Sequence, residues 1–172
     1  MRRFFSIFLS IISVSALFFC SGCAPIEAPS DVLAYQRDAA TATVSGSIGE
    51  LEFSAVITLC GCENVNERDF TVEYTAPAAL CGIVVSRRGG VYEAKLDTVR
   101  TTGKTAMRLS RPAEAFALGG EISQISTKES ETLISLSNAE VCLKNSAPTR
   151  IRMVCEDGVE LILKIEKYIK EG

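Results

Sequence analysis

The feature that most constrains the fold is an alternation of apolar and polar residues with a period of two, which begins at Ala40. In the stretch "LEFSAVITL", Phe53, Ile57 and Leu59 are separated by one residue or by three, and polar residues such as Glu52 fall between them. Successive side chains of a β-strand point to opposite faces, so this pattern indicates strands with one apolar face. The letters "SIGE" before it are typical of a turn, which predicts a β-hairpin.

The same alternation returns along most of the chain. Strands are predicted in "DFTVEYTAP", on both sides of Gly89-Gly90, two or three times in "EISQISTKESETLISLSNAEVCLKN", and on both sides of the turn "EDG" near the C-terminus. Short helices are predicted at residues 31–39 and 111–120, where Pro112 marks a start and two glycines mark a stop. Eight to ten strands with two helical interruptions predict a mainly β (α+β) fold, a curved antiparallel sheet or incomplete β-barrel with short helices over its concave face.

The N-terminus has the layout of an exported protein. Arg2 and Arg3 precede a run of apolar residues and serines that ends in "CSGC", which is the order found in secretory signal peptides. The four letters resemble a bacterial lipobox, with Cys20 at the position usually held by an aliphatic residue. The resemblance implies that Cys23 receives a diacylglyceryl group and becomes the mature N-terminus. An uncleaved membrane anchor and an ordinary secretory signal are the alternatives.

This interpretation divides the chain into three parts. Residues 1–22 are a lipoprotein signal peptide, residues 23–30 are an acylated N-terminus and a proline-containing tether, and residues 31–172 form a single β-rich domain. The expected location is the extracytoplasmic face of the cell membrane, with the membrane as a partner through acylated Cys23. Because 21 acidic residues outnumber 18 basic ones and no basic cluster stands out, nucleic acid is excluded as a partner.

Five cysteines follow the tether, and an odd number in an exported chain leaves at least one unpaired. A disulfide between Cys60 and Cys62 requires strained geometry because one residue separates them. The chain has no histidine and no second short cysteine pair, so no metal site is predicted. The interpretation favoured for several of these cysteines is a small buried apolar residue. A disulfide or a structural zinc is the alternative for the set Cys60, Cys62, Cys81, Cys142 and Cys155.

Catalysis has little support in the sequence. General acid–base chemistry and nucleophile activation usually draw on histidine, and none is present. The pattern "SGSIG" falls in a predicted hairpin turn, where the nucleophile elbow of a hydrolase does not form. We therefore expect a protein that is not an enzyme and that uses no cofactor.

The order of these elements resembles a known superfamily. A lipobox is followed by a short helix, strand pairs, "DFTVEYTAPAALCGIVV", an alanine-rich helix with a proline, and "CLKNSAPTRIRM". This order resembles the outer-membrane lipoprotein carriers of the LolA and LolB type. The resemblance implies an incomplete barrel whose apolar concave face is partly covered by helices and receives acyl chains.

Two functions are compatible with this fold. The first is noncatalytic binding of a lipid, an acyl chain or another apolar ligand in a concave cavity. The second is an envelope structural or protein-interaction module in which the chain's own side chains fill the same space. Apolar alternation is required by both, so the pattern leaves them open. The residues predicted to line the cavity under the first hypothesis are Phe53, Phe70, Val72, Tyr74, Tyr92, Leu96 and Phe116.

Overall fold

The computed structural model describes residues 32–171, so the predicted signal peptide, Cys23 and the tether lie outside the described residues. Most of the described chain forms β-strands joined by short turns. In chain order the strands are β1 (Ala40–Ile48), β2 (Leu51–Leu59), β3 (Phe70–Ala76), β4 (Val84–Arg88), β5 (Val91–Leu96), β6 (Val99–Thr102), β7 (Ile122–Lys128), β8 (Glu131–Leu136), β9 (Ala139–Lys144), β10 (Ala147–Val154) and β11 (Glu160–Lys170).

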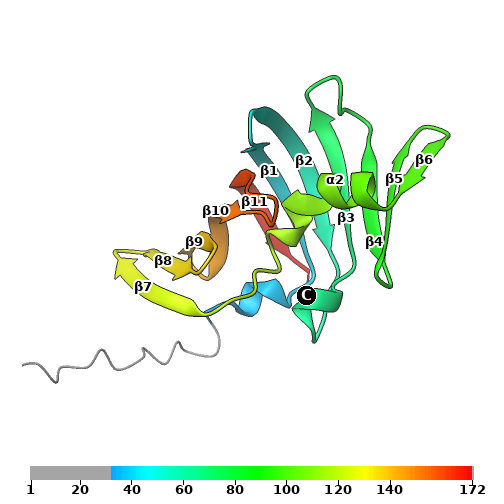
Figure 1. Ribbon diagram of the computed structural model, residues 1–172. Coiled ribbons are helices and arrows are strands. Elements are labelled where there is room, and N and C mark those ends of the chain that lie inside the picture. Colours follow the sequence, from blue (N-terminus) through cyan, green and yellow to red (C-terminus); the bar gives the residue numbers. More distant parts are fainter. Residues whose placement is uncertain (1–31, 172) are drawn as a thin grey trace, which may run out of the picture.

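All of these strands belong to one antiparallel sheet, in the order β6-β5-β4-β3-β2-β1-β11-β10-β9-β8-β7. The first and last strands meet in its middle, where Ala40 is opposite Lys170 and Ile48 is opposite Leu161. The sheet is open, with β6 and β7 at its two edges, and it curves around a concave face (Figure 1). The prediction of a mainly β fold with a curved antiparallel sheet is confirmed.

The period-two pattern correctly predicts which face of each strand is buried. On β2, Phe53, Ile57 and Leu59 are buried, while Glu52 is exposed. The predicted turns after β1 and after β4 are also present. Strand β6 was not predicted, because its four residues "VRTT" are all exposed and so carry no alternation that marks a buried face.

The helical elements differ in extent from the prediction. The N-terminal segment contains only the 3₁₀-helix η1 (Ala34–Gln36), and a second one, η2 (Val65–Glu67), follows β2. The α-helix is α2 (Lys104–Glu114), so the predicted range of 111–120 was wrong and Pro112 lies in the last turn. The start of the helix was predicted wrongly because the buried face of α2 consists of small residues, which form no apolar stripe in the sequence. These residues are Ala106, Ser110 and Ala113.

The concave face forms the hydrophobic core of the described chain. It is filled from below by side chains of β1, β2, β3, β9 and β11 and from above by α2 and the segment that follows it. Small residues on the underside of α2 allow its backbone to approach the sheet closely. No helix within residues 32–171 has the length and apolar character needed to cross a bilayer.

Candidate functional site: a groove beside helix α2

Helix α2 covers one half of the concave face and leaves a groove beside it. The helix packs on β3, β4, β5 and β6, and Figure 1 shows it lying across these strands. The hydroxyl of Tyr74 on β3 donates a hydrogen bond of 2.7 Å to the carbonyl of Leu109, near the middle of the helix. Because Tyr74 is buried, this bond fixes the height of α2 above the sheet.

The segment after α2 is fixed from below by two polar side chains. Arg68 is 1% exposed and donates to the carbonyl oxygens of Phe116, at 3.5 Å, of Cys60, at 3.0 Å, and of Asp38. Gln36 donates to the carbonyl of Leu118 at 3.3 Å. Burial lowers the pKa of the Arg68 guanidinium, which nevertheless stays charged at neutral pH. One buried cation therefore joins three chain segments that lie far apart in the sequence.

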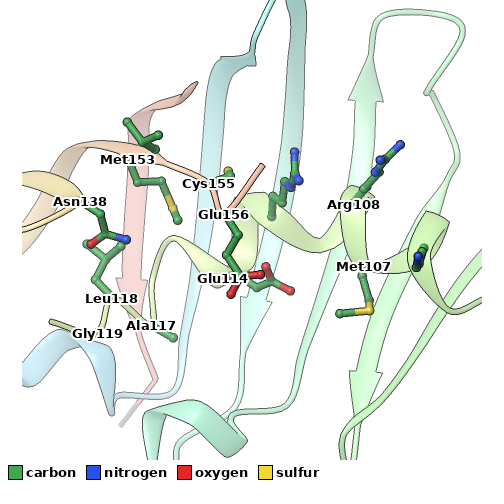
Figure 2. A pocket seen from close by; sticks show the side chains of 13 residues that line it. Met107, Arg108, Glu114, Ala117, Leu118, Gly119, Asn138, Met153, Cys155 and Glu156 are labelled. Carbon is green, nitrogen blue, oxygen red and sulfur yellow. The ribbon is translucent and has the colours of Figure 1, made fainter. Parts of the chain in front are cut away.

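The groove lies between α2 and the turn from β10 to β11, and its volume is about 380 Å³. Its lining includes apolar and sulfur-containing side chains from both walls. Figure 2 shows Met153, Leu118 and Asn138 at one end, Met107 and Arg108 at the other, and two carboxylates between them. The lining residues are Lys104, Met107, Arg108, Arg111, Glu114, Ala117, Leu118, Gly119, Asn138, Met153, Val154, Cys155 and Glu156.

The charged groups of the groove are partly paired. Arg111 on α2 forms an ion pair of 2.6 Å with Asp157 in the β10–β11 turn, which joins the two walls. This hydrogen bond lowers the pKa of the Asp157 carboxyl and raises that of Arg111. Glu114 accepts a hydrogen bond of 2.7 Å from the Ser110 hydroxyl. Glu114 and Glu156 lie between the two ends of the groove, so it has charged groups along its middle and apolar side chains towards its ends (Figure 2).

Cys155 is the one buried cysteine of the five that the structure describes, and it lines the groove. Burial raises the pKa of its thiol, and the nearby guanidinium of Arg111 opposes this shift without reversing it. The thiol is therefore protonated at neutral pH, whereas nucleophilic cysteines act as thiolates. The arrangement suits an apolar contact rather than covalent chemistry.

All five of these cysteines are free thiols, so no disulfide forms within residues 32–171. Cys60 and Cys81 are exposed, and Cys62 and Cys142 are partly exposed. The prediction of several buried cysteines therefore holds for Cys155 alone. The same described range contains no group of three or more His, Cys, Asp or Glu side chains placed to hold a metal ion.

Most residues predicted to line a cavity lie in the core under α2. Phe53, Phe70, Val72, Tyr74 and Phe116 are all buried, and the ring of Phe53 meets that of Tyr74 edge-on at 5.7 Å between centroids. These side chains contact neighbours from the sheet and the helix. Phe53 also borders a second hollow of about 480 Å³ between β1, β2 and the end of β3.

The other two predicted residues lie towards the edge of the sheet. Tyr92 is half-buried and meets Phe70 at 6.2 Å between ring centroids. Leu96 is 42% exposed at the end of β5, away from the groove. The structure thus brings six of the predicted residues onto or above one face of the sheet, and the groove lining contains none of the seven.

Sequence reasoning missed Met107, Leu118 and Met153 as lining residues. Met153 falls in a predicted strand before the turn "EDG", and Leu118 falls in the predicted helix at residues 111–120, but nothing in the sequence indicates that the two lie side by side. Their proximity depends on the curvature that brings β10 towards the segment after α2. Local periodicity carries no information about contacts between residues that lie far apart in the sequence.

The chain is similar to several solved structures in its fold. Neither a known protein family nor a curated protein matches the sequence. An uncharacterized conserved protein from Thermus thermophilus matches with a TM-score of 0.50 at 17% identity, over 83% of this chain and 85% of that chain. A LolA superfamily protein from Nitrosomonas europaea matches with a TM-score of 0.44 at 10% identity, over 83% and 93% of the two chains.

A third match is a domain from Vibrio parahaemolyticus described as a "putative outer membrane lipoprotein-sorting protein domain". It has a TM-score of 0.42 and 8% identity, over 82% of this chain and 91% of that chain. The structural neighbours are LolA superfamily, lipoprotein-sorting and MucB-like proteins. These are the kinds of protein that the order of elements in the sequence resembles. At these identities the likeness concerns the fold alone.

Proposed function

We propose that this protein is a lipid-anchored, extracytoplasmic binding protein that holds an acyl chain or another apolar ligand without catalysis. The groove beside α2 is the proposed binding site. Its volume of about 380 Å³ is within the range of small-ligand pockets, roughly 300–1,000 Å³. Leu118 and Met153 at one end and Met107 at the other offer apolar contact, and each buried methylene of a ligand contributes about 0.8 kcal/mol.

The observation that carries this proposal is the placement of the groove on the concave side of the sheet. Much of its apolar contact comes from methionines, whose flexible thioethers adapt to ligands of different shape. The predicted lining residues, such as Phe53 and Tyr74, form the packed layer next to the groove. In this proposal they support the site, and they contact ligand only where a chain extends beneath α2.

A groove-filling variant tests the site. Ala117 is half-buried in the groove wall, so Ala117→Trp places an indole into the space proposed for the ligand. We expect at least a tenfold loss of acyl species released by solvent extraction of the purified full chain. The matched control is Ser126→Trp, an exposed position on the edge strand β7 that should retain wild-type levels. Equal recovery from both variants would contradict the proposal.

The lipid anchor is proposed from the sequence pattern around Cys23. The expected mature protein begins at Cys23 and carries acyl chains, and Cys23→Ala should yield an unacylated chain that retains Met1. Intact mass measurement of the membrane-extracted protein distinguishes the two. An unmodified Cys23 in the wild-type protein would remove the anchor from the proposal and leave the groove untouched.

A second candidate function is a protein-interaction module. It is favoured by the packing of Phe53, Phe70, Val72, Tyr74 and Phe116, which fill the concave face beneath α2. The open edge of β7 also offers unpaired backbone groups to an added strand. Cross-linking on intact cells that captures a stoichiometric protein partner, with no acyl species in the groove, would favour this alternative.

A further inference from the structure

The charged side chains of the groove follow a defined order along α2. Four charged residues of this helix line the groove, and their spacing of three or four positions places them on one side of it. They are Lys104, Arg108, Arg111 and Glu114. Figure 2 shows Arg108 at one end of the groove, Glu114 in the middle and Leu118 at the other end. A ligand that runs the length of the groove therefore passes charges of different sign in a fixed sequence.

Arg111 is neutralised from the opposite wall of the groove. Its guanidinium lies 2.6 Å from the carboxylate of Asp157 in an ion pair. The hydrogen bond to Asp157 raises the pKa of Arg111, and the negative charge of Glu114 adds a smaller rise. This guanidinium therefore faces carboxylates from both walls and is not left free for an anionic ligand.

The middle of the groove carries an excess of negative charge. Glu114 on α2 and Glu156 on the opposite wall form no ion pair within residues 32–171, and Figure 2 shows both between the two ends. Glu114 accepts a hydrogen bond of 2.7 Å from the Ser110 hydroxyl, which leaves its charge in place. Once Arg111 and Asp157 cancel each other, these two carboxylates remain for a ligand.

The end of the groove next to Met107 is positive. Lys104 and Arg108 form no ion pair in the described part of the chain, and the acidic residues of the lining are Glu114 and Glu156, which lie in the middle. Arg108 precedes Glu114 by six residues, which is about 9 Å along a helix axis. From one end to the other, the groove is thus apolar, negative and positive.

We propose that the groove binds a zwitterionic amphiphile in which a cationic nitrogen lies between the apolar chain and an anionic group. The chain contacts Leu118, and the nitrogen lies near the carboxylates of Glu114 and Glu156. The anionic group lies near Arg108. This inference rests on the proposed function of the groove and specifies the ligand. An amphiphile with the same two charges in reverse order places like charges together, so the groove discriminates against it.

Two detergents with equal chains and opposite charge order test this. Octyl sulfobetaine has the order chain, ammonium, sulfonate, and octylphosphocholine has the order chain, phosphate, ammonium. The full chain in nanodiscs of phosphatidylglycerol, a lipid without a cationic nitrogen, is titrated with each detergent below its critical micelle concentration. The chain has three methionines, so the ¹³C-methyl signals of Met107 and Met153 report on both ends of the groove. We expect the Kd of octyl sulfobetaine to be about tenfold lower.

Charge variants identify the groups that determine the preference. Arg108→Gln with Glu156→Gln removes one charge of each sign from exposed positions in the groove and should reduce the preference to about threefold or less. The matched control is Glu140→Gln with Lys144→Gln, which removes the same two charges from exposed positions on β9 and should retain the full preference. Because all four positions are exposed, we expect both double variants to fold, which their melting temperatures check.

The possible failures are distinguishable. Equal Kd values for the two detergents, both raised by Ala117→Trp, would overturn the proposed charge order and leave the groove as a site for apolar ligands. A preference that persists in Arg108→Gln with Glu156→Gln would overturn it as well, because other groups would then be responsible. Binding of neither detergent, or binding that Ala117→Trp does not weaken, would remove the proposed function of the groove and this inference with it.

Discussion

At the scale of single residues, Arg68 offers the sharpest test of how the groove wall is held. Replacing it with methionine keeps much of its volume but leaves the carbonyls of Cys60 and Phe116 without their donor. We expect Arg68→Met to lower the free energy of unfolding by about 3 kcal/mol, because buried acceptors lose their partners. Urea denaturation measures this. Arg150→Met, at an exposed position on β10, is the control and should change stability by less than about 0.5 kcal/mol.

The ion pair between Arg111 and Asp157 predicts a dependence on pH. Its hydrogen bond holds the pKa of the Asp157 carboxyl below the ordinary value, so the folded state binds this proton less readily than the unfolded state. The stabilisation is therefore complete above the unfolded pKa of about 3.9 and is lost as the pH falls through the lower folded value.

Thermal unfolding of wild type and Asp157→Asn between pH 3 and pH 7 checks this sign. The difference in melting temperature between the two proteins should be constant above about pH 5 and should shrink below about pH 4. A difference that grows on acidification would show that another group dominates. The pair is partly exposed, so high salt should also reduce the difference.

At the scale of elements, the contact between β1 and β11 closes the chain into one sheet. Gly46 on β1 lies opposite Leu163, and a Cβ at Gly46 would overlap the carbonyl oxygen of Ile162. We expect Gly46→Ala to destabilise the protein by about 3 kcal/mol, since a strand backbone has little room to shift. Gly119→Ala is the control, because nothing lies within 4 Å of its added methyl group. Equal melting temperatures for the two variants would contradict the observed strand pairing.

The elements that the sequence predicted well are those with one buried face. The alternation correctly predicted that Phe53 and Ile57 lie on the inner side of β2, because a strand that is buried on one face alternates apolar and polar residues. Strand β6 has no buried face, so its sequence shows no such alternation. Helix α2 was misplaced because Ala106 and Ser110 are buried for their small size, and small residues carry little hydrophobic signal.

The groove was harder to predict than the sheet. A sequence pattern identifies which side chains face inward, but helix placement decides whether those side chains meet ligand or one another. Here Tyr74 fixes α2 above the predicted lining residues, and the open space lies beside the helix, next to Met153. Where such a helix settles depends on long-range packing, which local periodicity does not encode.

At the scale of the whole molecule, the proposals give the protein a ligand groove within the domain in addition to its anchor. The groove lies between α2, which packs on β3 to β6, and the β10–β11 turn, so its two walls belong to the two halves of the sheet. The anchor and the groove are tested separately, by Cys23→Ala and by Ala117→Trp.

The most direct test of the central claim is to map where an acyl chain contacts the protein. Cells expressing the full chain are supplied with a photoactivatable fatty acid and irradiated, and the purified protein is digested and analysed by mass spectrometry. The groove account predicts adducts on peptides that contain Met107, Leu118 or Met153, and predicts their loss in Ala117→Trp but not in Ser126→Trp. Adducts spread evenly over the exposed surface, or unchanged in Ala117→Trp, would contradict it.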